Sequence, residues 1–290
     1  MPANDDLVKE GVEAEKRSDL GHAERCYLVV LKDPPSEKVL AEVHCRLANL
    51  YRNQCDWDKA LHHARESGRV AKRLDDPKQY AEALNAEALV HQSRGVFHEA
   101  KALLEQVLAA TDDSRLRGLA LQNLGSIAAH SGDLGSAERY FAESYGCFMK
   151  ADFPRGEAMS LNNYGRAALD RGNLALADEV LCKAVEIARE IEDAELIAIA
   201  TLNYAEAIQR KGNLPRAEDL ASSALGYFAH TGNTWRHIEC LRLLGDIHAQ
   251  SKKWEIAKRC YEEGLDLARK IGARLEMSTL TEALGTLAKR

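Results

Sequence analysis

Three asparagines, Asn123, Asn163 and Asn203, follow one another along the sequence at intervals of 40 residues. A side-chain amide carries both donors and an acceptor, so a row of amides at one register is able to hold the main chain of a bound peptide whatever its sequence. The same amides are equally able to hydrogen-bond a neighbouring helix and keep it in line. The residue types leave both interpretations open.

Three arginines, Arg166, Arg210 and Arg242, lie near the same register as these amides. A guanidinium group binds a carboxylate through two parallel hydrogen bonds, so these side chains are candidates for holding acidic groups of a ligand. An exposed arginine is also able to stay solvated or to pair within its own chain. The pattern predicts recognition of a ligand and leaves these alternatives open.

Signs of catalysis and of metal binding are weak. The sequence has no GxxxxGK[ST], GxGxxG, HExxH or GxSxG motif. We expect ordinary histidines at His62, His63, His91 and His248 and predict no cofactor and no metal. The seven cysteines are odd in number and form no CxxC pair, which favours reduced thiols; Cys26 is expected to be a buried packing thiol.

The composition and charge narrow the class of partner. A formal net charge of -6 argues against nucleic acid and anionic membranes, because binding to either depends on clustered Lys and Arg. The N-terminal MPANDDLVKEG carries acids where a signal peptide needs a basic segment, and no stretch is apolar enough to span a membrane. We therefore expect a cytoplasmic protein whose partner is a protein or peptide, with the oligomeric state left open.

A repeat supplies the framework for these side chains. Alanines recur at spacings of 37 or 40 residues, and an apolar residue followed by a small one usually precedes each alanine by 13 and 12 residues. Apolar residues within each unit recur at helical spacing, so each unit should contain two amphipathic helices that pack closely. We expect Gly95, Gly132, Gly172 and Gly212 to close the first helix, and Asp133, Asn173 and Asn213 to cap the second. The anchors are Ala23, Ala60, Ala100, Ala137, Ala177, Ala217 and Ala257.

This pattern of large and small residues, turn glycine and anchor alanine resembles the tetratricopeptide repeat in its variant of about 40 residues, as in Pins-type adaptors, kinesin light chains and Rap-type bacterial regulators. The resemblance implies an all-α, right-handed superhelical solenoid of about seven helix hairpins and a C-terminal capping helix. It implies one array over residues 1–290, with approximate repeats at 4–36, 41–75, 79–113, 117–150, 156–192, 196–231 and 236–272, and the capping helix at 274–289.

In the resembled family, the helix face opposite the packed face lines a concave groove that binds a peptide or a helix of a partner. Polar residues would hold the ligand, and apolar ones, chiefly Leu119, Met159, Leu169 and Leu202, would form the floor of the groove. The residues that the resemblance assigns to partner binding are Asn49, Arg52, Asn85, Gln92, Leu119, Gln122, Asn123, Met159, Asn162, Asn163, Arg166, Leu169, Leu202, Asn203, Glu206, Gln209, Arg210 and Arg242.

The expected function is therefore that of a non-catalytic scaffold or adaptor. One alternative is a structural subunit of a larger complex, held by its convex face or its ends; exposed aromatic residues on second helices would favour it, and Tyr140, Phe148, Tyr227 and Phe228 are the candidates. Another is a peptide-responsive regulator of the Rap type, although the sequence shows no separate N-terminal three-helix bundle.

Overall fold

The protein is built from helices alone throughout residues 4–289, the part of the chain that the computed structural model describes. None of the described helices combines the length and the apolar character that crossing a bilayer requires. The helices are α1 (Asn4–Lys16), α2 (Leu20–Val30), α3 (Glu37–Asn53), α4 (Trp57–Arg73), α5 (Pro77–Ser93), α6 (Phe97–Ala110), α7 (Ser114–His130), α8 (Leu134–Lys150), α9 (Pro154–Asp170), α10 (Leu174–Glu190), α11 (Ala194–Arg210), α12 (Leu214–Thr231), α13 (Thr234–Gln250), α14 (Trp254–Ile271) and α15 (Arg274–Leu287).

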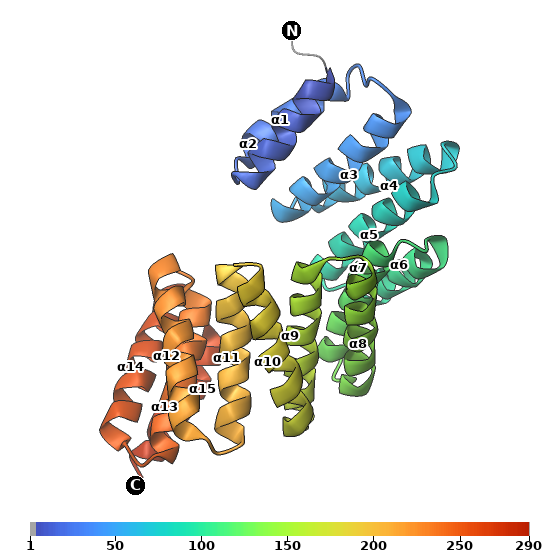
Figure 1. Cartoon of the computed structure of the whole chain (residues 1–290). Helices are drawn as coiled ribbons and strands as arrows, with labels where there is room; N and C mark the ends of the chain where they lie inside the picture. The colour runs from blue at the N-terminus through green and yellow to red at the C-terminus, as the bar shows by residue number, and fades with distance from the viewer. Residues whose placement is uncertain (1–3, 290) are drawn as a thin grey trace. The chain divides into compact units, whose positions relative to one another are not determined.

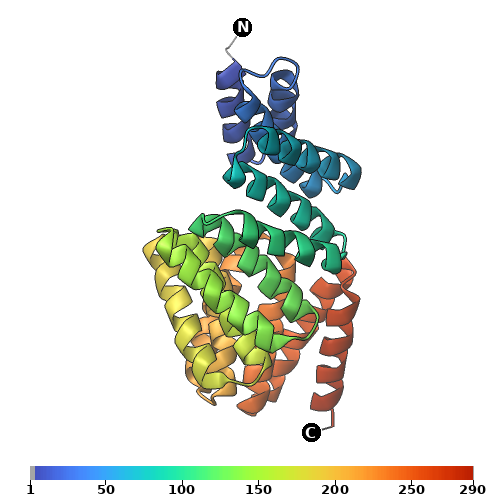
Figure 2. The ribbon, with the colours of Figure 1, turned by 90° about the vertical axis from the view of Figure 1, so that its right-hand side faces the viewer.

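Consecutive helices pair as hairpins, from α1 with α2 to α13 with α14, and α15 packs on α14. The all-α class, with seven hairpins and a final single helix, is confirmed. The helices form two compact units, one up to Asp152 and one from Phe153 onward. In the second unit, α9 to α14 lie side by side with their axes nearly aligned (Figure 1). Figure 2 shows this unit from its side, in yellow-green to red.

The turn inside each hairpin places one residue in the left-handed region. Gly95, Gly132, Gly172 and Gly212 adopt φ values of 75°, 80°, 80° and 88°, as predicted. Where the sequence lacks the glycine, the same geometry is kept by other residues, namely Ser18, Cys55 and Lys252. The hairpin therefore imposes this conformation, and glycine only lowers its cost.

The N-termini of the second helices are capped as the sequence predicts. The side-chain oxygens of Asp133, Asn173 and Asn213 accept hydrogen bonds from backbone N–H groups three residues later, at 3.0, 3.3 and 3.3 Å. Such a cap satisfies one of the donors that a helix start leaves unpaired and contributes about 1 kcal/mol.

Small residues on the first helices make room for large side chains of the second helices. A Cβ atom at Gly165 would lie 2.3 Å from Leu181 Cγ, and one at Gly245 would lie 2.2 Å from Tyr261 Cε1. The sequence predicts close packing of the two helices in each hairpin. The structure shows that the space is filled by a side chain of the same hairpin.

The aromatic residues proposed for an exposed second-helix surface lie mostly inside the protein. Phe148 and Phe228 are fully buried, and Tyr140 and Tyr227 are partly buried. Tyr140 packs against the core around α5 to α8. The expectation of an exposed aromatic surface was therefore wrong for Phe148 and Phe228, whereas Tyr140 and Tyr227 keep part of their surface open.

Candidate functional site

Many of the predicted binding residues of the second unit line one polar pocket of about 430 Å³, which lies on the first helices α9, α11 and α13 and reaches α15. The predicted residues in it are Asn162, Asn163, Arg166, Leu202, Asn203, Glu206 and Arg242. Glu239, which the sequence also places on this helix face, and three residues that it did not single out complete the lining, namely Arg236, Leu243 and Glu276.

This pocket of the second unit is called the second pocket below. Its side-chain amides bond to each other. Asn203 Nδ2 donates to Asn162 Oδ1 at 2.8 Å, which joins α11 to α9, and Asn162 Nδ2 donates to Asn163 Oδ1 at 3.3 Å. Asn162 and Asn203 are almost completely buried. At these two positions the structure favours the second of the two interpretations, in which amides keep adjacent helices in line.

The charged groups of the second pocket are also engaged within the chain. Glu206 lies between two arginines: Arg166 Nη1 bonds Glu206 Oε2 at 2.7 Å, and Arg210 Nη2 bonds Glu206 Oε1. Arg166 also bonds Asp170 at 2.9 Å, and Arg210 donates to the main-chain oxygen of Leu169 at 2.8 Å. These groups are already paired, so a ligand would have to compete for them.

A similar cluster surrounds Asp246. Arg242 Nη1 bonds Asp246 Oδ2 at 3.2 Å, and the Tyr261 hydroxyl donates to Asp246 Oδ1 at 2.7 Å. Burial raises the pKa of the Asp246 carboxyl, although both partners favour its charged form. The three arginines that the sequence offers for ligand carboxylates are Arg166, Arg210 and Arg242. Each of them forms an ion pair inside the second unit.

Several predicted binding residues are turned into the core. Leu169 is fully buried and cannot form the floor of a groove, which corrects the expectation for this residue. The helix rotation that exposes Arg166 turns Leu169 inward. Leu202, Gln122 and Gln209 expose less than a tenth of their surface, whereas the predicted Leu119 and Met159 are half-buried.

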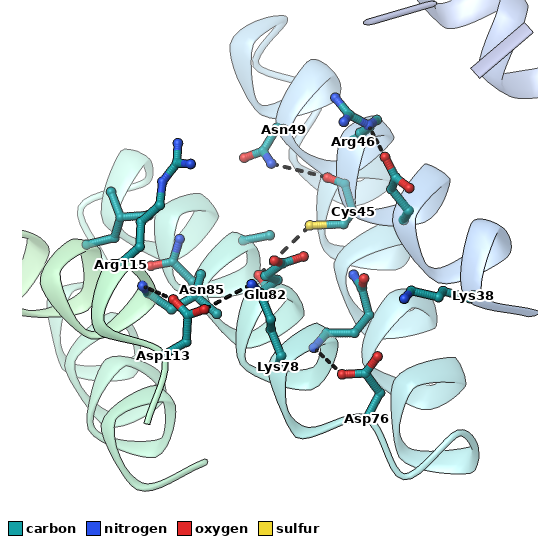
Figure 3. A pocket seen from close by; sticks show the side chains of 15 residues that line it. Lys38, Cys45, Arg46, Asn49, Asp76, Lys78, Glu82, Asn85, Asp113 and Arg115 are labelled. Atoms are coloured by element: carbon teal, nitrogen blue, oxygen red, sulfur yellow. Dashed lines mark hydrogen bonds and ion pairs between the residues drawn. The ribbon is translucent and has the colours of Figure 1, made fainter. Parts of the chain in front are cut away.

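The first unit contains a larger pocket, of about 710 Å³, on the first helices α3, α5 and α7 (Figure 3). Asn49, Asn85 and Leu119 were predicted to lie on this face, and all three line the pocket. The other lining residues are Lys38, Glu42, Cys45, Arg46, Asp76, Lys78, Gln79, Glu82, Ala86, Asp113, Arg115 and Leu116.

Most charges in this first pocket are neutralised by neighbours. Lys78 pairs with Asp113 at 2.9 Å, and Arg46 bonds Glu42 at 2.9 Å and Glu15 at 3.2 Å. Asp76 caps the start of α5 by accepting from the Gln79 backbone N–H at 2.9 Å. These pairs set the shape of the pocket and leave few groups available to a ligand.

Two polar side chains on α5, those of Gln79 and Glu82, are the least satisfied groups of this pocket. Gln79 is 8% exposed, and its Nε2 atom is buried without a hydrogen-bond acceptor in the described chain. Glu82, three residues later on the same helix face, is half-buried, and the charge of Lys78, four residues earlier, acts on its carboxylate although Lys78 forms its ion pair with Asp113. Burial raises the pKa of the Glu82 carboxyl. Gln79 and Glu82 both line the pocket, and the unpaired Nε2 atom of Gln79 lies beneath the pocket surface, so a ligand reaches it only when the side chain turns.

The other predicted positions of the first unit are dispersed. Asn123 Nδ2 donates to Asn85 Oδ1 at 3.4 Å, which repeats the amide contact of the second unit in a looser form. Arg52 has a buried Nε without a partner, and burial lowers its pKa. Gln92 has a buried Oε1 that accepts no hydrogen bond. Asn123, Arg52 and Gln92 lie outside the lining of the first pocket.

Gln79 and Glu82 escaped prediction because they lie in the first half of α5, whereas sequence reasoning followed the register of Asn123 and Asn163. The pairing of Arg166 with Glu206 could have been found, because opposite charges stand one repeat of 40 residues apart. The absence of a partner at Gln79 carries no signal in the sequence, since it depends on the packing of α3 and α7 around it.

The geometry defines a class of helical repeat protein whose first helices carry polar pockets. The comparison with family models agrees: residues 39–113 and 196–270 match a tetratricopeptide repeat model, and residues 159–191 match a second model of the same description. The chain belongs to the tetratricopeptide repeat family.

Solved structures show the same fold at low sequence identity. A signal transduction ATPase from Pyrococcus horikoshii with a tetratricopeptide repeat sensor gives a TM-score of 0.75 at 16% identity, covering 97% of this chain and 44% of that one. A Rap protein complexed with competence and sporulation factor gives 0.68 at 14% identity, covering 98% and 85%. The apo form of RapI gives 0.66 at 14% identity, covering 93% and 99%. No curated protein matches the chain significantly by sequence.

Proposed function

We propose that the protein is a non-catalytic scaffold that binds a peptide segment of a partner protein, and that the first pocket is the principal binding site. One observation carries this choice: a buried amide donor at Gln79 has no acceptor, and the half-buried carboxylate of Glu82, whose neighbour Lys78 pairs with Asp113, lines the same pocket. An unsatisfied buried polar group costs about 1–3 kcal/mol, which a bound ligand recovers by supplying the missing bond.

The chemistry of the two groups specifies the ligand. Gln79 Nε2 donates, so it requires an acceptor such as a main-chain carbonyl of the peptide. Glu82 accepts, and its charge favours a Lys or Arg side chain of the ligand. Leu116 and Leu119 give the pocket an apolar part that suits an aliphatic neighbour of that basic residue.

The test is a selection from a display library of random peptides on the purified protein. The expected result is enrichment of peptides that share a Lys or Arg, with binding lost in Gln79→Leu and Glu82→Lys variants. A Glu143→Lys variant is the matched control, since Glu143 is exposed on α8, outside the pocket. Selected peptides that bind all variants equally would refute the proposed site.

A second candidate, a subunit held in a larger complex by one end, is favoured by an apolar cluster in the second unit. Trp235, Ile271 and Leu275 are 46%, 46% and 72% exposed. They lie at the start of α13, the end of α14 and the start of α15, which the hairpin topology places at the same end of the unit. Replacing Leu275 by Asp should release a partner held at this end and leave peptide binding in the first pocket unchanged.

A further inference from the structure

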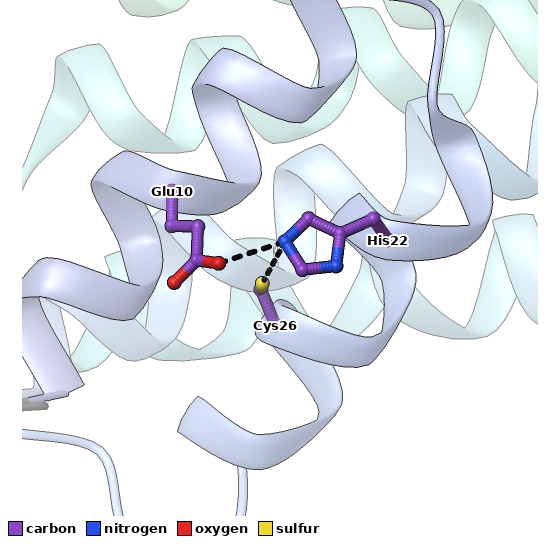
Figure 4. Close-up of side chains that lie close together, drawn as sticks. All are labelled: Glu10, His22 and Cys26. Carbon is purple, nitrogen blue, oxygen red and sulfur yellow. Dashed lines mark hydrogen bonds and ion pairs between the residues drawn. The ribbon is translucent and has the colours of Figure 1, made fainter. Parts of the chain in front are cut away.

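We infer that the first hairpin contains a binding site for a zinc-class divalent ion, formed by Glu10, His22 and Cys26 (Figure 4). His22 and Cys26 are four residues apart on α2 and so share one face of the helix. Glu10 faces them from α1, the antiparallel partner. One donor atom from each residue lies within 4.8 Å of the other two.

The two donor-atom distances that involve His22 lie close to those of a tetrahedral ion. Cys26 Sγ lies 3.7 Å from His22 Nε2, and bond lengths of about 2.3 and 2.0 Å to zinc require about 3.5 Å between these atoms. Glu10 Oε1 lies 2.8 Å from the same nitrogen, so the carboxylate must retreat by about 0.5 Å to admit the ion. Glu10 is an exposed side chain and can make this shift by a small rotation.

The donor set and its charge select the class of ion. A thiolate, an imidazole and a carboxylate are the three ligand types of protein zinc sites, whereas Mg²⁺ and Ca²⁺ take oxygen ligands. The thiolate and the carboxylate together neutralise the two charges of the ion. Cys26 is 4% exposed and forms the floor of the site, while His22 and Glu10 are partly open to water, so an ion can enter.

Binding is a proton exchange without oxidation or reduction. Cys26 Sγ forms a bond to the ion and releases its thiol proton to solvent. The hydrogen bond between His22 Nε2 and Glu10 breaks, and the imidazole carries its proton on Nδ1 so that Nε2 binds the ion. The fourth coordination position is left to water. The consequence is a metal clip that joins α1 to α2.

Arg25 opposes this tautomer and provides a sharp test. Its Nη2 lies 3.5 Å from His22 Nδ1, and a guanidinium can only donate, so it favours an unprotonated Nδ1. Arg25 is exposed and must turn away when the ion binds. An Arg25→Gln variant, whose amide oxygen is able to accept from Nδ1–H, should bind the ion more tightly than the wild-type protein.

The experiment is a titration of the full chain with Co²⁺ as a spectroscopic probe, followed by displacement with Zn²⁺. We expect one Co²⁺ per chain, with a thiolate charge-transfer band and the intense visible bands of tetrahedral coordination. Cys26→Ser should abolish the charge-transfer band, and His22→Gln and Glu10→Gln should each weaken binding at least about tenfold. Circular dichroism confirms that each variant is folded.

Cys260→Ser is the matched control, because Cys260 follows its anchor alanine at the same spacing as Cys26 but Ile256 stands in place of the histidine. Its spectrum should equal that of the wild-type protein. A second readout is hydrogen exchange. Zn²⁺ should slow the exchange of α1 amides in the wild-type protein and leave it unchanged in the Cys26→Ser variant. A wild-type chain without the charge-transfer band, a band that survives Cys26→Ser, or an Arg25→Gln variant that binds no more tightly would overturn the assignment.

Discussion

Lowering the pH from 7 to 5 should destabilise the first unit, chiefly through the imidazole of His63, while burial also lowers the pKa of its neighbour His44. His63 on α4 is 8% exposed, and its Nδ1 lies 2.8 Å from Nδ1 of His44 on α3. Its ring also stacks on Tyr51. Burial, and then the neighbouring His44 and His62, lower the pKa of His63 to about 4. Two neutral imidazoles can share one proton in this bond, whereas two protonated rings would direct N–H groups at each other.

The magnitude follows from the two pKa values. The unfolded chain binds a proton at this residue near pH 6.5, and the folded chain does so only near pH 4. Stability is therefore unaffected above about pH 7 and falls as the pH drops from 6.5 toward 4. Between pH 7 and 5 the expected loss in the free energy of unfolding is about 2 kcal/mol.

The assay is urea unfolding at pH 7 and at pH 5, with Trp57 as the reporter in a Trp235→Phe, Trp254→Phe background. Trp57 packs against the core of the first unit, so its fluorescence reports on the region around His63. A His63→Gln variant should lose about 2 kcal/mol less than the parent between the two pH values. His98→Gln is the control, because His98 is exposed on α6 and does not act on His63, and this variant should behave as the parent. Equal pH dependence of the parent and His63→Gln would refute the reasoning.

Two further changes test the packing and the ion pairs of the second unit by urea unfolding. Glu206→Leu should lower the free energy of unfolding by about 2 kcal/mol, because it leaves two arginines without their shared carboxylate. The double variant Arg166→Leu, Glu206→Leu should lose less than the sum of the two single losses. Strictly additive losses would show that the ion pair contributes nothing to stability. Gly245→Ala should cost about 1–3 kcal/mol because its Cβ would lie 2.2 Å from Tyr261 Cε1, whereas Gly226→Ala, in open space on α12, should stabilise the protein by about 0.5–1 kcal/mol. Equal effects of the two glycine changes would contradict the packing argument.

The repeat could be predicted because its signals are local. The spacing of the anchor alanines, the turn glycines and the capping residues at 133, 173 and 213 each depend on neighbours within one hairpin. The left-handed conformations of Ser18, Cys55 and Lys252 show that the hairpin geometry persists where the glycine signal is missing.

The candidate site could be predicted only in part, because burial and pairing depend on contacts between hairpins. The sequence identified the helix face of Arg166, Asn163 and Asn203, but not that Glu206 already neutralises Arg166 or that Leu169 turns inward. Periodicity assigns a residue to a face of a helix, whereas the rotation of that helix against its neighbours decides which edge of the face is open. For the same reason the unused groups of Gln79 became visible only in the folded chain.

The central claim is that Glu82 in the first pocket binds a basic side chain of a peptide, and a charge exchange tests it most directly. A peptide obtained by selection on the wild-type protein is measured by titration calorimetry, together with a version whose Lys or Arg is replaced by Glu. The account predicts that Glu82→Lys lowers the affinity for the original peptide at least about tenfold. The charge-exchanged peptide should regain affinity for this variant. Glu143→Lys should change the affinity for either peptide by no more than about twofold. If Glu82→Lys binds the original peptide as tightly as the wild-type protein does, or if the exchanged peptide recovers nothing, the first pocket is not the binding site.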